Sequence, residues 1–205
     1  FPKWKSAATA ALSAKKRIGR MLSMAAKPII LTIDIVLLFC YSMIFYRCTM
    51  KNIRKATQKD LARIAEIEVF NYRLNFYPIF KDDDFYFSEL QVLNLMESYQ
   101  PRIETMWVYD DGVIKGFVQV SSKEIKKLFV EPALQGNAIG SNLLNFAIEE
   151  FDAYFLWALE KNVRAIKFYQ RHGFRATSEK KFEEDTTEYL VRMERDILKE
   201  TNRSE

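Results

Sequence analysis

Apolar and polar residues follow two different rhythms along most of the chain after residue 52. Alternating or continuous β-prone apolar residues predict strands, and apolar residues spaced every three to four positions predict helices. The two patterns alternate, which favours an α+β fold with a mixed, mostly antiparallel sheet flanked by helices. We expect the order β-α-α-β-β-β-α-β-α-β-β, with strands near 53–56, 105–109, 113–120, 124–130, 153–159, 174–181 and 188–193.

Two short polar signals mark element boundaries. Residues 110–112 are Asp-Asp-Gly between two β-prone runs, and Asp-Gly in that setting is a strong hairpin signal. Thr57 is followed three residues later by Asp60, which resembles a capping box with Asp in place of the usual Glu or Gln. We expect this pair to open a helix that reaches Tyr72.

The next stretch shows no clear period. Phe70 to Asp84 mixes aromatic residues with Pro78 and three consecutive aspartates, so we expect a loop there. A second helix should follow near residues 88–98. This region carries no pattern from which we could infer a binding site.

The charge of the chain is unevenly distributed. The formal net charge is +4, but residues 1–49 hold eight Lys or Arg and one Asp, and the rest has 23 basic and 26 acidic residues. A nucleic-acid-binding domain gathers Lys and Arg on its folded part to neutralise phosphates. The slight acidic excess after residue 49 therefore argues against a nucleic-acid partner.

Cysteine and histidine are too scarce for several kinds of site. Cys40 and Cys48 both precede Met50, so the region after it has no disulfide, no thiolate ligand and no cysteine nucleophile. His172 is the only histidine, which excludes sites that need two imidazoles. We expect no metal, and we expect His172 to occupy a solvated turn.

Residues 128–144 carry the most informative pattern, a strand followed by a glycine-containing turn and an amphipathic helix. Free N–H groups and the positive end of the helix dipole meet at such a turn, where small residues let a diphosphate approach the backbone. Gly140 is followed by Ser141-Asn142 rather than Lys-Ser/Thr, which disfavours a nucleoside triphosphate site. The spacing of Gly136 and Gly140 also fails the dinucleotide pattern.

This turn resembles the coenzyme A diphosphate loop of the GNAT superfamily of N-acyltransferases, Q/R-x-x-G-x-G/A. Gln135, Ala138 and Gly140 stand at its defined positions, and Ala138 replaces a usual glycine, which is tolerable if its φ is negative. Downstream, residues 162–174 resemble the family block N-x-x-A-x-x-F-Y-x-x-x-G-F. The likeness extends from about residue 53 to 195 and is weak between 70 and 101.

The resemblance implies a splayed sheet that binds acetyl-CoA. It assigns Tyr169 as the acid that protonates the leaving thiolate and Glu124 as a general base. The cofactor would be held by Leu128, Phe129, Val130, Gln135, Gly136, Asn137, Ala138, Gly140, Ser141, Asn162, Ala165 and Phe168.

Each of these side chains has a purely structural alternative. Tyr169 could be an aromatic residue packed beside Phe168, and Glu124 an exposed carboxylate at a strand end. Asn162 could be an ordinary helix N-cap. Gln135 and Ser141 could shape the turn, with only backbone amides contacting the diphosphate.

The resemblance implies an acyltransferase that moves an acetyl group from acetyl-CoA directly to a primary amine of a small molecule or peptide, without a metal. The alternative is a non-catalytic acyl-CoA-binding sensor or interaction module. We expect a cytoplasmic monomer or homodimer. The identity of the acceptor does not follow from the fold.

Residues 1–49 are expected to stand apart from the domain. Basic residues precede an apolar run from Ile29 to Tyr46, whose length is close to the minimum for a membrane span. The chain begins with Phe1, and Met50 opens a segment similar to the start of many compact GNAT domains. We interpret 1–49 as translated upstream sequence, with a membrane anchor through 29–46 as the alternative, 50–196 as the domain and 197–205 as a polar tail.

Overall fold

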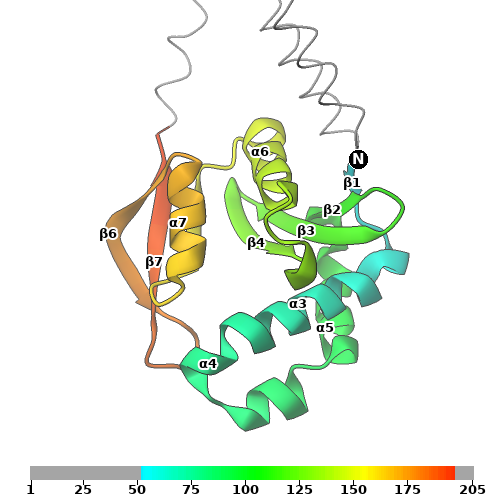
Figure 1. The fold of residues 1–205 in the computed structure, drawn as a ribbon, viewed down its shortest axis with the longest axis horizontal. Helices are drawn as coiled ribbons and strands as arrows, with labels where there is room; N and C mark the ends of the chain where they lie inside the picture. The colour runs from blue at the N-terminus through cyan, green and yellow to red at the C-terminus, as the bar shows by residue number, and fades with distance from the viewer. Residues whose placement is uncertain (1–51, 197–205) are drawn as a thin grey trace, which may run out of the picture. The chain divides into compact units, whose positions relative to one another are not determined.

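The computed structural model describes residues 52–196, which form a seven-stranded sheet with helices on both faces (Figure 1). The strand order across the sheet is β1-β2-β3-β4-β5-β7-β6. The strands are β1 (Ile53–Lys55), β2 (Met106–Asp110), β3 (Ile114–Ser121), β4 (Glu124–Val130), β5 (Phe155–Leu159), β6 (Phe174–Phe182) and β7 (Tyr189–Arg195).

The sheet is antiparallel except between β4 and β5. These two parallel strands pair only at Glu124 with Phe155 and at Ile125 with Leu156. Beyond Ile125 the strands separate, so the backbone of β4 has an open edge on that side. The mixed, splayed α+β sheet expected from the sequence is confirmed.

One face of the sheet is covered by α6 (Ile139–Phe151) and α7 (Val163–Arg171). Figure 1 shows α6 beside β3 and β4, and α7 beside β6 and β7. Gly116 on β3 lets α6 approach, because a Cβ there would lie 2.8 Å from the Phe129 carbonyl oxygen and 3.1 Å from the Leu143 side chain. The buried apolar residues of this layer form one continuous core.

The other face is covered by α3 (Leu61–Asn75) and α5 (Val92–Tyr99). Consecutive residues of β3 point to the two faces: Phe117 packs in the core under α3 and α5, and Val118 packs in the core under α6. The site described below therefore lies on a sheet held between two helical layers.

The loop expected between Phe70 and Asp84 is wrong in part. Helix α3 continues to Asn75, and a short helix α4 (Tyr77–Phe80) follows. Pro78 lies in the first turn of α4, where its missing N–H costs no hydrogen bond, so it starts a helix here and does not mark a loop. A π-helical turn at Phe85–Glu89 then precedes α5, which begins four residues later than expected.

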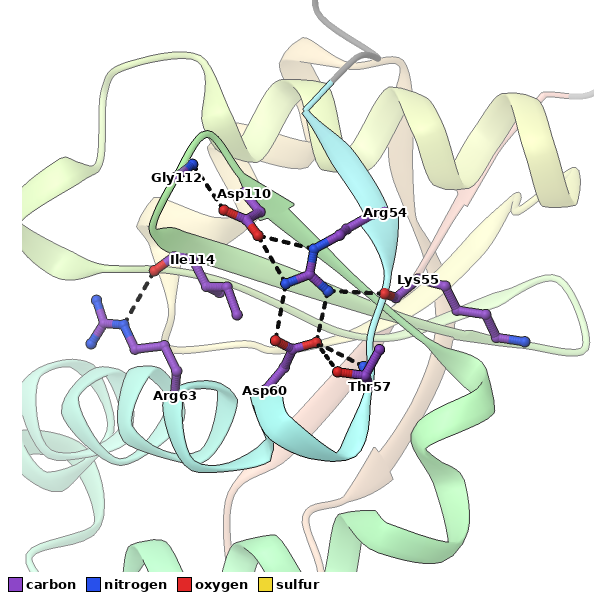
Figure 2. Close-up of polar contacts among 8 residues, drawn as sticks. All are labelled: Arg54, Lys55, Thr57, Asp60, Arg63, Asp110, Gly112 and Ile114. Carbon is purple, nitrogen blue, oxygen red and sulfur yellow. Dashed lines mark hydrogen bonds and ion pairs between the residues drawn. The ribbon is translucent and has the colours of Figure 1, made fainter.

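Arg54 joins the first strand to the start of α3 and to the hairpin (Figure 2). Its guanidinium contacts Asp60 at 2.7 Å and Asp110 at 2.8 Å, and the Thr57 N–H donates to Asp60 at 2.7 Å. The hydrogen bond from Arg54, more than any other contact, lowers the pKa of Asp60 to about 2. The Asp in the predicted capping box thus pairs with a cation as well as with the backbone.

The apolar run at 29–46 and the tail at 197–205 lie outside the described residues, so the expectations about an upstream segment, a membrane anchor and a polar tail stay predictions. Within residues 52–196, every helix is too short or too polar to cross a bilayer.

Candidate functional site

A cavity of about 500 Å³ lies beside the open edge of β4. It is lined by β4, the following turn, α3, the start of α6 and one side of α7. All of the predicted cofactor residues except Asn137 line it, together with Tyr169. Asn137 lies outside this lining, where its exposed side chain donates to the Leu134 carbonyl at 3.1 Å.

The turn between β4 and α6 adopts two left-handed backbone positions. Gly136 has a φ of +88° and Ala138 has a φ of +61°. The negative φ that would make alanine easily tolerated at position 138 is therefore absent, and Ala138 takes a conformation that glycine adopts at lower cost. This strained backbone position lies at Ala138, the N-cap residue immediately before α6.

The first turn of α6 presents N–H groups at the cavity. The Asn142 N–H donates to the Ala138 carbonyl at 2.9 Å, and it is the first amide with an acceptor in the preceding turn. The amides of Ile139, Gly140 and Ser141 come before it, and Gly140 and Ser141 line the cavity. This arrangement suits an anion.

The open edge of β4 also directs N–H groups into the cavity. The Glu131 N–H points toward β3, where it donates to the Lys115 carbonyl at 2.8 Å. Because N–H directions alternate along a strand, the amides of Leu128 and Val130 face the opposite, open side. Both residues line the cavity.

The carbonyl of Val130 is held by two side-chain amides. Asn71 donates to it at 3.0 Å and Gln135 at 3.3 Å, and Gln135 also donates to the Asn71 side-chain oxygen at 3.1 Å. Gln135 therefore ties the turn to α3, which agrees with the structural role that the sequence analysis gave as its alternative to cofactor binding. Asn71 is 2% exposed, and our sequence analysis missed it, although a buried polar residue on the apolar face of a helix is a usable signal.

The side chain of Asn162 caps α7. Its oxygen accepts a hydrogen bond from the Ala165 N–H at 3.1 Å, as expected for an N-cap. Both residues also line the cavity. The cap fixes the start of the helix that carries Phe168 and Tyr169.

His172 lies in the turn expected from the sequence, but it is only partly exposed and is bonded at both ring nitrogens. Nδ1 lies 2.8 Å from the Phe168 carbonyl oxygen, and Nε2 lies 3.0 Å from the Ser141 hydroxyl. A carbonyl can only accept, so Nδ1 carries a hydrogen and a neutral ring accepts from Ser141 at Nε2. His172 thus links the end of α7 to the first turn of α6.

Tyr169 is 9% exposed, and part of it faces the cavity. Its ring packs edge-on against Phe168 and Phe174, with centroids 5.2 and 5.9 Å away. Within residues 52–196 no hydrogen bond engages its hydroxyl. Burial raises the pKa of Tyr169, so the phenol keeps its proton at neutral pH.

Two arginines that the sequence analysis missed complete the cavity. Arg164 and Arg171 lie on α7, seven residues and about 10 Å apart along the helix axis, and both line the cavity. The lining contains no carboxylate. The charged groups at this cavity are therefore all cationic, which favours an anionic ligand.

A second cavity of about 660 Å³ shares Phe76 and Phe129 with the first. Three glutamates line it, among them Glu124, whose side chain is 14% exposed and forms an ion pair with Lys126. The structure therefore separates Glu124 from the cavity that holds Tyr169. Phe76 and Phe129 form the boundary where ligands in the two cavities would meet.

Comparisons with known proteins agree with this architecture. A family model described as acetyltransferase (GNAT) domain matches residues 102–176. Among similar solved structures is apo YjaB from Escherichia coli, with a TM-score of 0.55 and 20% identity over 69% of this chain and 95% of that one.

Two similar structures contain a ligand. The PaiA N-acetyltransferase of Thermoplasma acidophilum, in complex with coenzyme A, has a TM-score of 0.52 and 16% identity over 69% of this chain and 97% of its own. YncA from Salmonella typhimurium, with its cofactor acetyl-CoA, has a TM-score of 0.50 and 20% identity over 71% and 94%. Residues 102–176 thus match a GNAT acetyltransferase model, and residues 52–196 share the fold of these acetyltransferase structures.

Proposed function

We propose that this domain is an N-acetyltransferase that moves an acetyl group from acetyl-CoA to a primary amine. The observation that carries the proposal is the meeting of two cavities at Phe76 and Phe129, beside the open edge of β4. One cavity has cationic side chains and free amides suited to a diphosphate, and the other has carboxylates suited to an ammonium group. Coenzyme A bound to PaiA and acetyl-CoA bound to YncA support the choice of cofactor.

The turn and helix α6 would hold the diphosphate through the amides of Gly140 and Ser141. The amides of Leu128 and Val130 would pair with the pantetheine arm and polarise the thioester carbonyl. Acetyl-CoA would supply a thioester carbon that accepts the amine nitrogen directly. Binding both substrates beside Phe129 supplies the proximity that the reaction needs.

Tyr169 would protonate the departing sulfur. Burial makes this phenol a weaker acid, but the same apolar surroundings also raise the pKa of a thiol placed beside it. The phenol therefore still has a proton to give to a thiolate formed in that environment.

The test is thiol release from acetyl-CoA with a panel of amines, together with calorimetry of coenzyme A binding to the full chain. We expect micromolar or tighter binding, and for Tyr169→Phe a fall in kcat of roughly 100-fold with little change in coenzyme A affinity. Tyr154→Phe is the matched control, because Tyr154 lies outside both cavities. Absence of coenzyme A binding would remove the proposal, and binding without turnover on any amine would favour a non-catalytic acyl-CoA sensor.

A further inference from the structure

The second cavity has an aromatic wall. Six aromatic side chains from both sides of the open sheet edge line it: Tyr72, Phe76, Phe80, Phe129, Trp157 and Phe182. The Tyr72 ring lies 4.8 Å from the Phe76 ring and 5.8 Å from the Phe129 ring, so three of them form one continuous surface. Such a wall favours a ligand with a flat apolar body.

The lysines of this cavity are already engaged. Lys126 pairs with Glu124, and Lys127 pairs with Glu68, a carboxylate that is 1% exposed. The Lys181 ammonium lies 4.6 Å from the centre of the Trp157 ring. The cavity therefore offers little attraction for a carboxylate or phosphate on the acceptor.

Glu183 differs from the other acidic side chains here. It follows β6 at the hairpin tip, where its N–H donates to the Glu188 carbonyl at 2.8 Å and its carbonyl accepts from the Thr186 N–H at 3.1 Å. Its half-buried carboxylate forms no hydrogen bond or ion pair within residues 52–196. Burial raises the pKa of Glu183, which makes it a better base than an ordinary glutamate.

We propose that the second cavity binds a primary amine with an aromatic or similarly flat apolar body, and that Glu183 accepts a proton from its ammonium group. This inference rests on the proposed N-acetyltransferase function. It replaces Glu124 as the base, because Glu124 is neutralised by Lys126 on the same strand.

Glu183 and Tyr169 together account for every proton transferred in the proposed reaction. Glu183 takes one proton from the ammonium, which leaves a lone pair on nitrogen. The C–N bond forms and the C–S bond breaks, with the electron pair leaving on sulfur. Tyr169 gives its proton to that sulfur and regains one from the acylated nitrogen, and Glu183 releases its proton to solvent.

The substrate class is tested on the full chain by thiol release with 2-phenylethylamine, n-butylamine and spermidine. We expect kcat/KM for 2-phenylethylamine to exceed that for n-butylamine by roughly 10- to 100-fold, because the ring is buried against the aromatic wall. Higher kcat/KM for spermidine or n-butylamine would overturn this inference and leave the proposed function intact. Lack of turnover with every amine would instead overturn the proposed function.

The role of Glu183 is tested with Glu183→Gln, and Glu184→Gln is the matched control. Glu184 lines the same cavity but is exposed. We expect Glu183→Gln alone to lower kcat by roughly 100-fold and to abolish the fall in kcat/KM at acidic pH that protonation of the base causes. Unchanged coenzyme A affinity shows that the variant is folded.

Three results contradict the role of Glu183. Equal losses of kcat in Glu183→Gln and Glu184→Gln would mean that Glu183 only attracts the ammonium group electrostatically. If kcat/KM of Glu183→Gln still fell at acidic pH, another residue would be the general base. Loss of coenzyme A binding in Glu183→Gln would make the residue structural. Glu183→Asp should recover part of kcat if the carboxylate itself acts.

Discussion

Ala138 shows how a single backbone angle affects this site. A left-handed conformation costs an L-residue roughly 1–2 kcal/mol, and glycine avoids this cost while losing more entropy on folding. We expect Ala138→Gly to stabilise the domain by about 0.5–1 kcal/mol, measured by urea unfolding. Ala133→Gly is the control: Ala133 has no positive φ, and this change should destabilise the domain slightly.

Asp60 makes the stability of the domain depend on pH. Its pKa is about 2 in the folded state against 3.8 for the unperturbed group, so its contribution is present above about pH 4 and is lost as pH falls toward 2. Since Arg54 is partly exposed, we discount this contribution to about 1–2 kcal/mol.

The measurement is urea unfolding of the wild type and Asp60→Asn between pH 6 and pH 2.5. The difference in unfolding free energy between the two should shrink as the pH is lowered. Asp111→Asn is the comparison variant, because Asp111 forms only a surface pair with Lys115. A difference that stays constant over this range would contradict the assigned pKa.

At the scale of elements, the strands followed from the sequence because local signals and tertiary burial agree there. The Asp-Gly hairpin and the alternation on either side of it placed β2, β3 and β4 within a residue of their observed ends. The region after residue 70 was predicted less well. There, Pro78 and the aromatic residues suggest a loop when the sequence is taken alone. Their place in a short helix becomes clear only from the packing of α4 against α3.

The site divides in the same way. Residues 128–141 and 162–169 form local motifs, so the sequence alone identified them as candidate site residues. Asn71, Phe76 and the two α7 arginines line the same cavity because the fold brings α3 and α7 to it from distant parts of the sequence, and no local pattern encodes that arrangement.

The bond between α3 and β4 leads to a prediction at this scale. Asn71→Ala leaves the Val130 carbonyl with the longer hydrogen bond from Gln135 and removes a partner of that glutamine. We expect a loss of about 1–3 kcal/mol in unfolding free energy and weaker coenzyme A binding. Asn75→Ala is the control. Asn75 donates only to Asn71, within its own helix, and should cost much less.

At the scale of the whole molecule, net charge and local charge point in different directions. The sequence after residue 49 has more acidic than basic residues, yet the described cavity beside β4 has arginines and no carboxylate in its lining. Its neighbour across Phe129 is lined by three glutamates and three lysines, and each lysine is already engaged by a carboxylate or an aromatic ring. The placement of charge on either side of the open strand edge, rather than the total, therefore indicates which ligand each cavity accepts.

This separation of charge predicts salt-dependent cofactor binding. Coenzyme A is polyanionic, so its Kd should rise as salt screens Arg164 and Arg171 at the rim of the cavity. Replacing both by alanine should weaken binding by roughly tenfold at low salt and flatten the dependence of Kd on salt. Lys167→Ala removes a cation from the same helix outside the cavity and should change neither. Calorimetry at 50 and at 300 mM salt tests this, and an unchanged salt dependence in the double variant would mean that the arginines do not face the bound cofactor.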